Sequence, residues 1–156
     1  MPILNGIRVL DFTQYLAGLV VTRLIAEVGT EIIKIEHAPS GDPSGGLPFL
    51  KDGRSGYFVQ RNRGKQSVCL AFPKPEAREV LYDLVKKVDV MVENYGPGAM
   101  ARRGLDYTSA AKLNPKLFMA SISSFGNAIA FGQRIAQRTL RRRGVRLSRC
   151  SNPCRK

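Results

Sequence analysis

The chain has 156 residues, a formal net charge of +13 and a hydrophobic fraction of 44%. This length is enough for one domain with a sizeable core, and this composition argues against wholesale disorder. No stretch approaches the roughly 20 apolar residues that cross a bilayer, and the N-terminus lacks the basic start and apolar run of a secretory signal. We therefore expect no membrane association and a cytoplasmic location.

The positive charge is concentrated towards the C-terminus. Residues 127–156 hold nine of the 25 basic residues and no acid, and the last acidic residue of the chain is Asp106. Because this segment also lacks a hydrophobic period, we predict a domain at 1–126 followed by a basic tail at 127–156, either disordered or read out of frame. An arm that contacts nucleic acid is the alternative, but a single aromatic residue, Phe131, gives it little to stack on bases. We expect no nucleic-acid partner.

Apolar residues alternate between the period of a strand and that of a helix along residues 1–126. Strands are predicted at 7–11, 32–36, 68–72, 89–93 and 117–123, and helices at 16–28, 75–88, 99–103 and 108–114. A loop rich in Pro, Gly and Ser spans 38–48, a polar turn spans 62–67, and 56–59 is either a short helix or an extended piece. Strands that alternate with helices are typical of α/β folds with a parallel sheet.

The first strand–helix–strand unit, residues 5–36, places polar residues where ligands bind in such sheets, beyond the carboxyl ends of the strands. Asp11, residues 14–18, Glu36 and His37 fall at this rim. A dinucleotide-binding site is not favoured, because its fingerprint needs three glycines and only Gly18 follows the first strand.

Residues 93–98 also follow a strand and allow two interpretations. They form either a plain strand-to-helix turn or a binding segment, whose Asn94 amide, Tyr95 ring and exposed N–H groups suit a phosphate and a planar base. Basic side chains in nearby loops are either solvated surface charges or phosphate contacts. They are Arg63, Lys65, Arg102 and Arg103.

Three cysteines do not make a disulfide framework. Cys69 lies in an apolar strand and is predicted to be a small core residue. Cys150 and Cys154 are spaced like metal ligands, but the one histidine, His37, lies far away in the sequence and there is no second Cys pair. No metal site is predicted.

Short motifs follow one another in a fixed order from residue 3 to about 126. They are Gly6–Thr13, Leu16–Gly18, Glu31–Glu36, Gly41–Asp42, Asn62–Ser67, Pro75–Glu79, Asp89–Met100, Gly104–Tyr107, Asn114–Leu117 and Ala120–Ser123. In this order they resemble the N-terminal part of the class III CoA-transferases, which include formyl-CoA transferase, carnitine CoA-transferase and the α-methylacyl-CoA racemases. No single motif is decisive, but the ordered set is highly specific.

The resemblance implies a Rossmann-like domain that binds coenzyme A or acyl-CoA as substrate, without a metal. It implies transfer of CoA from an acyl-CoA to a small carboxylic acid, and in intact relatives an interlocked homodimer. The family nucleophile is an Asp that forms an acyl-aspartyl anhydride and then an aspartyl-CoA thioester. In the racemase branch the same Asp acts as acid and base, and the sequence leaves the two branches open.

Matched by position, the resemblance assigns CoA contacts to three groups of residues. Leu16, Ala17 and His37 would line the binding region of the adenosine on one side, and residues 70–73 on the other. The segment 94–96, after the strand 89–93, would contact the nucleotide, and Arg102 would contact a phosphate. The residues are Leu16, Ala17, His37, Leu70, Ala71, Phe72, Pro73, Asn94, Tyr95, Gly96 and Arg102. This chain departs from the family pattern at Leu19, His37, Pro73 and Ser124.

The catalytic residue of the family has no counterpart here. The family Asp lies well beyond the Phe125–Gly126 segment, and this chain has no acid after Asp106. We therefore predict no catalytic residue, and expect a chain that is truncated before the nucleophile and inactive on its own.

Overall fold

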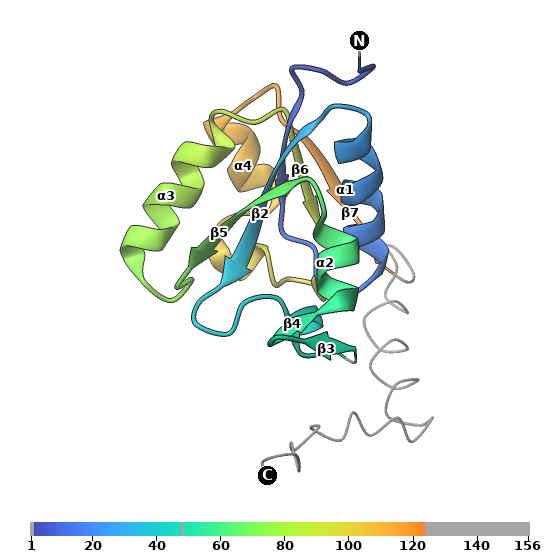
Figure 1. Ribbon diagram of the computed structural model, residues 1–156. Coiled ribbons are helices and arrows are strands. Elements are labelled where there is room, and N and C mark those ends of the chain that lie inside the picture. Colours follow the sequence, from blue (N-terminus) through green and yellow to red (C-terminus); the bar gives the residue numbers. More distant parts are fainter. Residues whose placement is uncertain (1, 48, 124–156) are drawn as a thin grey trace. The chain divides into compact units, whose positions relative to one another are not determined.

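The structure is a computed structural model that describes residues 2–47 and 49–123 (Figure 1). Its main sheet has five parallel strands in the order β5-β2-β1-β6-β7. The strands are Arg8–Asp11 (β1), Glu31–His37 (β2), Lys65–Leu70 (β5), Val90–Glu93 (β6) and Phe118–Ser121 (β7). The predicted α/β fold with a parallel sheet is confirmed.

Helices connect successive strands and cover both faces of the sheet. They are Ala17–Glu27 (α1), Gly56–Asn62 (α2), Pro75–Val85 (α3), Tyr107–Leu113 (α4) and the 3-10 turn Ala101–Arg103 (η2). Figure 1 shows α1 and α2 on one face and α3 and α4 on the other. From β1 the chain runs outward through β2 to β5, and then returns to β6 on the other side of β1. The strand order therefore reverses between β1 and β6, which is where such sheets bind ligands.

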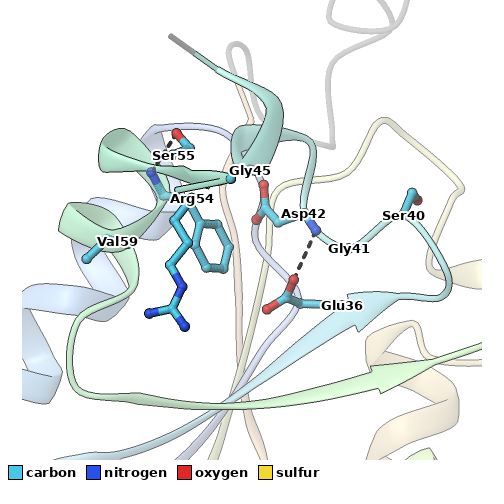
Figure 2. Close-up of a pocket in the computed structure, with 10 residues that line it drawn as sticks. Glu36, Ser40, Gly41, Asp42, Gly45, Arg54, Ser55 and Val59 are labelled. Carbon is cyan, nitrogen blue, oxygen red and sulfur yellow. Dashed lines mark hydrogen bonds between the residues drawn. The ribbon is translucent and has the colours of Figure 1, made fainter. Parts of the chain in front are cut away.

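The connection from β2 to β5 holds more regular structure than the sequence indicated. The predicted loop at 38–48 contains the 3-10 turn Pro43–Gly46 (η1), and the undecided residues 56–59 lie in α2. Between them lies a short hairpin of Leu50–Lys51 (β3) and Arg54–Ser55 (β4). Ser55 caps α2 by accepting a hydrogen bond from the Phe58 amide at 3.3 Å. Together these segments wall a cavity beside the end of β2 (Figure 2).

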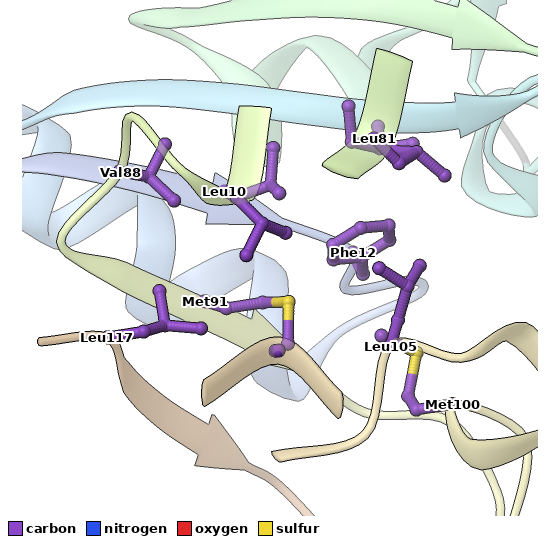
Figure 3. Close-up of a cluster of buried hydrophobic side chains, with 11 residues drawn as sticks. Leu10, Phe12, Leu81, Val88, Met91, Met100, Leu105 and Leu117 are labelled. Atoms are coloured by element: carbon purple, nitrogen blue, oxygen red, sulfur yellow. The ribbon is translucent and has the colours of Figure 1, made fainter. Parts of the chain in front are cut away.

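Two apolar layers pack against the two faces of the sheet, because side chains alternate along each strand. In β1, Val9 belongs to the layer that contains residues of α1, and Leu10 to the layer under α3 and α4. Figure 3 shows the larger layer, which contains Phe12, Met91 of β6 and Leu81 of α3. Each such side chain contributes about 1.5–3 kcal/mol through burial.

The spacing of apolar residues in 16–28 predicts a buried helix face made of Leu16, Val20, Leu24, Ile25 and Val28, and this prediction is partly wrong. The buried residues of this helix are Gly18, Leu19 and Thr22, whereas Leu16 and Leu24 are 50% and 48% exposed. The reason is a close approach: a Cβ atom at Gly18 would overlap the side chain of Thr13. The helix therefore packs through Gly18, Leu19 and Thr22, and Ile25 also packs against the layer that contains Val9.

Three smaller predictions also need correction. Cys69 is exposed rather than buried, because β5 is an edge strand. Residues 65–67, predicted as a turn, already belong to β5, which ends at Leu70. Helix α4 runs from Tyr107 to Leu113 with Asp106 as its N-cap, one residue earlier at each end than the predicted helix 108–114. The predicted tail at 127–156 lies outside the described residues.

Candidate functional site

The residues predicted to contact CoA all follow carboxyl ends of strands or begin a helix there. Leu16 and Ala17 start α1, His37 ends β2, Leu70 ends β5 and Arg102 lies in η2. The others are loop residues directly after β5 or β6: Ala71, Phe72, Pro73, Asn94, Tyr95 and Gly96. The parallel sheet thus gathers them at one rim.

Asn94 joins the loop after β6 to the loop after β1 at the point where the strand order reverses. Its Oδ1 accepts a hydrogen bond from the Gln14 amide, and its Nδ2 donates to the Gln14 carbonyl, both at 2.8 Å. The Gln14 side chain in turn donates from Nε2 to the Tyr95 hydroxyl at 3.2 Å. Gln14 therefore ties both loops together, a role that its place in the sequence did not reveal.

The turn after β1 carries an unusual backbone conformation. Tyr15 has a φ of +64°, in the left-handed region that few residues other than glycine adopt. The turn leads into α1, whose N-cap Leu16 makes no side-chain cap and whose first turn has no acid. The first N–H groups of α1 consequently lie at the rim without a capping side chain.

Aromatic rings approach each other on the α3 side of the rim. His37 and Phe72 meet edge to face, with ring centroids 5.2 Å apart and planes at 88°. The Arg103 guanidinium carbon lies 5.5 Å from the Phe72 ring centroid and 5.1 Å from that of Tyr95. We call these four residues, His37, Phe72, Tyr95 and Arg103, the aromatic cluster. Burial raises the pKa of the Tyr95 hydroxyl, and the charge of Arg103 partly opposes that rise.

Charged side chains on the other side of the rim are fully buried and paired. The Lys65 ammonium lies 2.9 Å from Asp11 Oδ2 and donates to Thr22 Oγ1 at 2.7 Å, while Thr13 donates to Asp11 Oδ1 from its amide and its hydroxyl. The Lys34 ammonium donates to the Thr13 carbonyl and lies 2.7 Å from Asp42 Oδ2. The set forms a buried ionic cluster: Asp11, Thr13, Thr22, Lys34, Asp42 and Lys65.

Two titratable groups of this cluster are shifted. Burial lowers the pKa of the Lys65 ammonium below its usual range, although the charge of Asp11 opposes the shift. For Asp42, burial on its own would raise the pKa of the carboxyl, but the hydrogen bond and charge of Lys34 outweigh it and lower the pKa. The Lys65–Asp11 pair joins the start of β5 to the end of β1, and the Lys34–Asp42 pair joins the middle of β2 to the loop that follows it, so neither leaves a charge for a ligand.

Four basic residues are predicted as either solvated surface charges or phosphate contacts, and two of them are taken up by ion pairs. Lys65 begins β5 and its side chain is 1% exposed. Arg63 precedes the same strand and pairs with Glu27 at 2.6 Å. The Lys65 ammonium is paired with Asp11, and Arg63 lies before the amino end of β5, so of the four only Arg102 and Arg103 lie in a segment that follows the carboxyl end of a strand.

A cavity of about 430 Å³ adjoins the rim beside Glu36 (Figure 2). The Glu36 carboxylate is already bonded: Oε1 accepts from the Ser67 hydroxyl at 2.7 Å and Oε2 from the Asp42 amide at 3.0 Å. Arg54 lines the same cavity, and within residues 2–47 and 49–123 its side chain has no ion pair. Phe58 and Val59 of α2 supply its apolar wall.

Within the described part of the chain, no three His, Cys, Asp or Glu side chains group as metal ligands. None of the helices found there is long and apolar enough to span a membrane. Cys150 and Cys154 lie outside the described residues.

A family profile matches the sequence over residues 4–138, and its description is CoA-transferase family III. The chain belongs to this family. The formyl-CoA:oxalate CoA-transferase of Afipia carboxidovorans is 43% identical over 124 residues, which cover 79% of this chain and 29% of that protein. Its counterpart in Bradyrhizobium diazoefficiens is 41% identical over the same shares of the two chains.

Solved structures resemble the fold of this family III chain over most of its length. A hypothetical protein of Mycobacterium tuberculosis aligns with a TM-score of 0.78 at 32% identity, over 86% of this chain and 37% of that one. A CAIB/BAIF family protein of Brucella suis aligns with a TM-score of 0.77 at 36% identity, over 83% of this chain and 35% of that one. The chain thus spans about a third of the length of its relatives.

Proposed function

We propose that this family III chain carries the CoA-binding rim of an enzyme that transfers CoA from an acyl-CoA to a small carboxylic acid. The observation that carries the proposal is the join between the loops after β1 and β6, where Asn94 and Gln14 exchange two hydrogen bonds at 2.8 Å. This join sits where the strand order reverses, which is the usual ligand position in a doubly wound sheet.

The rim has groups suited to each part of the coenzyme. The rings of Phe72 and Tyr95 and the half-exposed Leu16 offer apolar surface to an adenine base. The uncapped start of α1 offers N–H groups to a phosphate, and exposed Arg102 offers a guanidinium that can bind one through two hydrogen bonds. Ala17, His37, Leu70, Ala71, Pro73, Gly96 and Asn94 complete the proposed surface.

The cavity beside Glu36 is the proposed place of the carboxylic acid. Its volume of about 430 Å³ lies in the range of small-molecule sites. Its two carboxylates are already satisfied, Glu36 by two donors and Asp42 by Lys34. Arg54 therefore supplies the positive charge that would hold the acid.

We further propose that residues 1–156 bind CoA but do not catalyse, because no acid follows Asp106 that could serve as the family nucleophile. The complete enzyme would act as a homodimer in the cytoplasm, with no metal, membrane or nucleic-acid partner. Measurement of CoA transfer by the purified chain tests this part, and a robust transfer rate would contradict it.

Titration of the purified chain with CoA by calorimetry tests the binding part. We expect Asn94→Asp to weaken CoA binding at least about tenfold, because a carboxylate cannot donate to the Gln14 carbonyl and repels nearby phosphates. The matched control is Asn5→Asp, since Asn5 is exposed at the opposite end of β1 and should leave the affinity unchanged. If the folded wild-type chain, judged by circular dichroism, does not bind CoA, the proposed function is wrong.

A further inference from the structure

Arg103 joins two loops that the sheet itself keeps apart. Phe72 follows β5 and Tyr95 follows β6, and β2 and β1 lie between these two strands. At the usual spacing of about 4.8 Å between neighbouring strands, the ends of β5 and β6 are roughly 14 Å apart. Yet one guanidinium carbon lies within 5.5 Å of both ring centroids. The two aromatic side chains therefore reach towards each other over the ends of the central strands, with the guanidinium beside both.

The surroundings of Arg103 fix its side chain in this place. Its Nη1 donates to the Ala99 carbonyl at 2.9 Å, which anchors the guanidinium to the turn before η2. The residue itself is only partly exposed, so water weakens its attraction to the rings less than on an open surface. Tyr95 is held from a second direction by Gln14 Nε2, and Phe72 by the edge of His37.

We propose that Arg103 is a positioning residue, which holds the loops after β5 and β6 at the spacing that receives the planar base of the nucleotide. The inference rests on the proposed function, because the base belongs to the coenzyme A of that proposal. It assigns different roles to two adjacent arginines: exposed Arg102 contacts a phosphate, while Arg103 acts through the aromatic rings and does not touch the phosphates.

The experiment measures the affinity of the full chain for adenosine 3′,5′-bisphosphate, the nucleotide half of CoA, at several salt concentrations. Arg103→Gln keeps a hydrogen-bond donor near the Ala99 carbonyl but removes the charge between the rings. We expect it to weaken binding about tenfold without changing how strongly binding depends on salt, because no phosphate contact is lost. Arg102→Gln should weaken binding and also reduce the salt dependence.

Two further variants separate a positioning role from a general loss of structure. Arg103→Lys keeps the positive charge over the rings and should bind within about threefold of the wild type. Arg78→Gln removes an exposed arginine of α3 and should change nothing. The titration of Tyr95, followed by NMR of ring-labelled tyrosine and assigned with Tyr95→Phe, should shift to higher pH in Arg103→Gln, because the charge that opposes the rise in pKa is gone.

The outcomes are distinct. If the wild type does not bind the bisphosphate, the proposed function fails. If the wild type binds and Arg103→Gln binds equally well, or reduces the salt dependence as much as Arg102→Gln, the positioning role of Arg103 is wrong. Should Arg103→Gln fail to fold, Arg103→Lys decides: a folded Lys variant that has lost nucleotide affinity would overturn the inference.

Discussion

The buried ionic cluster and the aromatic cluster have the same structural role on the two sides of one rim, but the first acts through ion pairs and the second through aromatic and cation–π contacts. Each joins loops that leave different strands. The ionic cluster does so with side chains about 1% exposed or less, Lys34, Lys65 and Asp11 among them, whose charges pair with one another. The aromatic cluster does so with partly exposed rings around a single guanidinium.

The difference in burial and pairing indicates that the ionic cluster belongs to the scaffold of the domain and that the aromatic cluster belongs to a binding surface. Both oxygens of Asp11 already accept two hydrogen bonds each, so this carboxylate has little left to offer a ligand. Tyr95 and Phe72 are only partly buried and retain apolar surface that a ligand can cover. We therefore expect changes in the ionic cluster to reduce stability, and changes in the aromatic cluster to reduce affinity at little cost in stability.

The largest expected effect comes from Lys65→Met. The substitution leaves Asp11 buried without its counter-ion, and removal of one partner of a buried pair typically costs about 3–5 kcal/mol. We expect that loss in the free energy of unfolding, measured by urea denaturation. This is a large part of the 5–15 kcal/mol that holds a typical domain folded, so the variant will be only marginally stable.

Lys86→Met is the matched control. Lys86 pairs with Asp83 at 2.8 Å on the surface of the molecule, where water screens both charges. Its free energy of unfolding should be unchanged within the error of the measurement. If Lys65→Met proves as harmless as this control, the ionic cluster is not a scaffold and the contrast between the two sides of the rim disappears.

The fold was largely predictable because its elements carry local signals. The alternation of apolar residues revealed the strands of the sheet, and Gly29, with a φ of +103°, follows α1 as a helix-ending glycine should. The local pattern could not give the orientation of α1, because the helix packs through the fit of Gly18 against Thr13 and through Leu19, which lies outside the predicted face.

The site was predictable as a set of positions but not as a set of contacts. Asn94 and Tyr95 follow the carboxyl end of β6, where the pattern of elements predicted them, and their contacts with a ligand stay predictions. The partners of Lys65 and Arg103 could not be predicted from the sequence. Asp11 and Lys65, for example, are 54 residues apart and meet only through the order of the strands. Sequence reasoning therefore allows either a solvated surface charge or a phosphate contact for Lys65, and places Asp11 at the rim without naming a partner for it.

A smaller effect concerns pH and the Lys34–Asp42 pair. The pKa of Asp42 is lowered in the folded protein, so this carboxylate stabilises the fold above its ordinary pKa of 3.8, and the contribution is lost as the pH falls through the folded pKa. Asp42→Asn should have a lower free energy of unfolding than the wild type at pH 6, and this difference between the two proteins should become smaller below pH 3.8. Urea denaturation at several pH values measures it.

The control for this titration is Asp52→Asn, since Asp52 is exposed and lies in the turn between β3 and β4. Its stability should follow the wild type at every pH. A gap between Asp42→Asn and the wild type that stays constant from pH 6 to pH 3 would mean that the carboxylate charge of Asp42 does not stabilise the fold.

The smallest change in stability is expected on the aromatic side, from Tyr95→Phe. The substitution removes the hydroxyl that accepts from Gln14 Nε2 at 3.2 Å but keeps the ring beside Arg103. One such hydrogen bond is worth about 0.5–1.5 kcal/mol, so urea denaturation should show a loss of that order, and nucleotide affinity should fall less than in Arg103→Gln. Tyr107→Phe, at a tyrosine that is 57% exposed, is the control and should change neither quantity. A loss as large as that of Lys65→Met would show that the aromatic cluster is itself part of the scaffold, because a surface free to bind a ligand cannot also carry most of the stability of the loops around it.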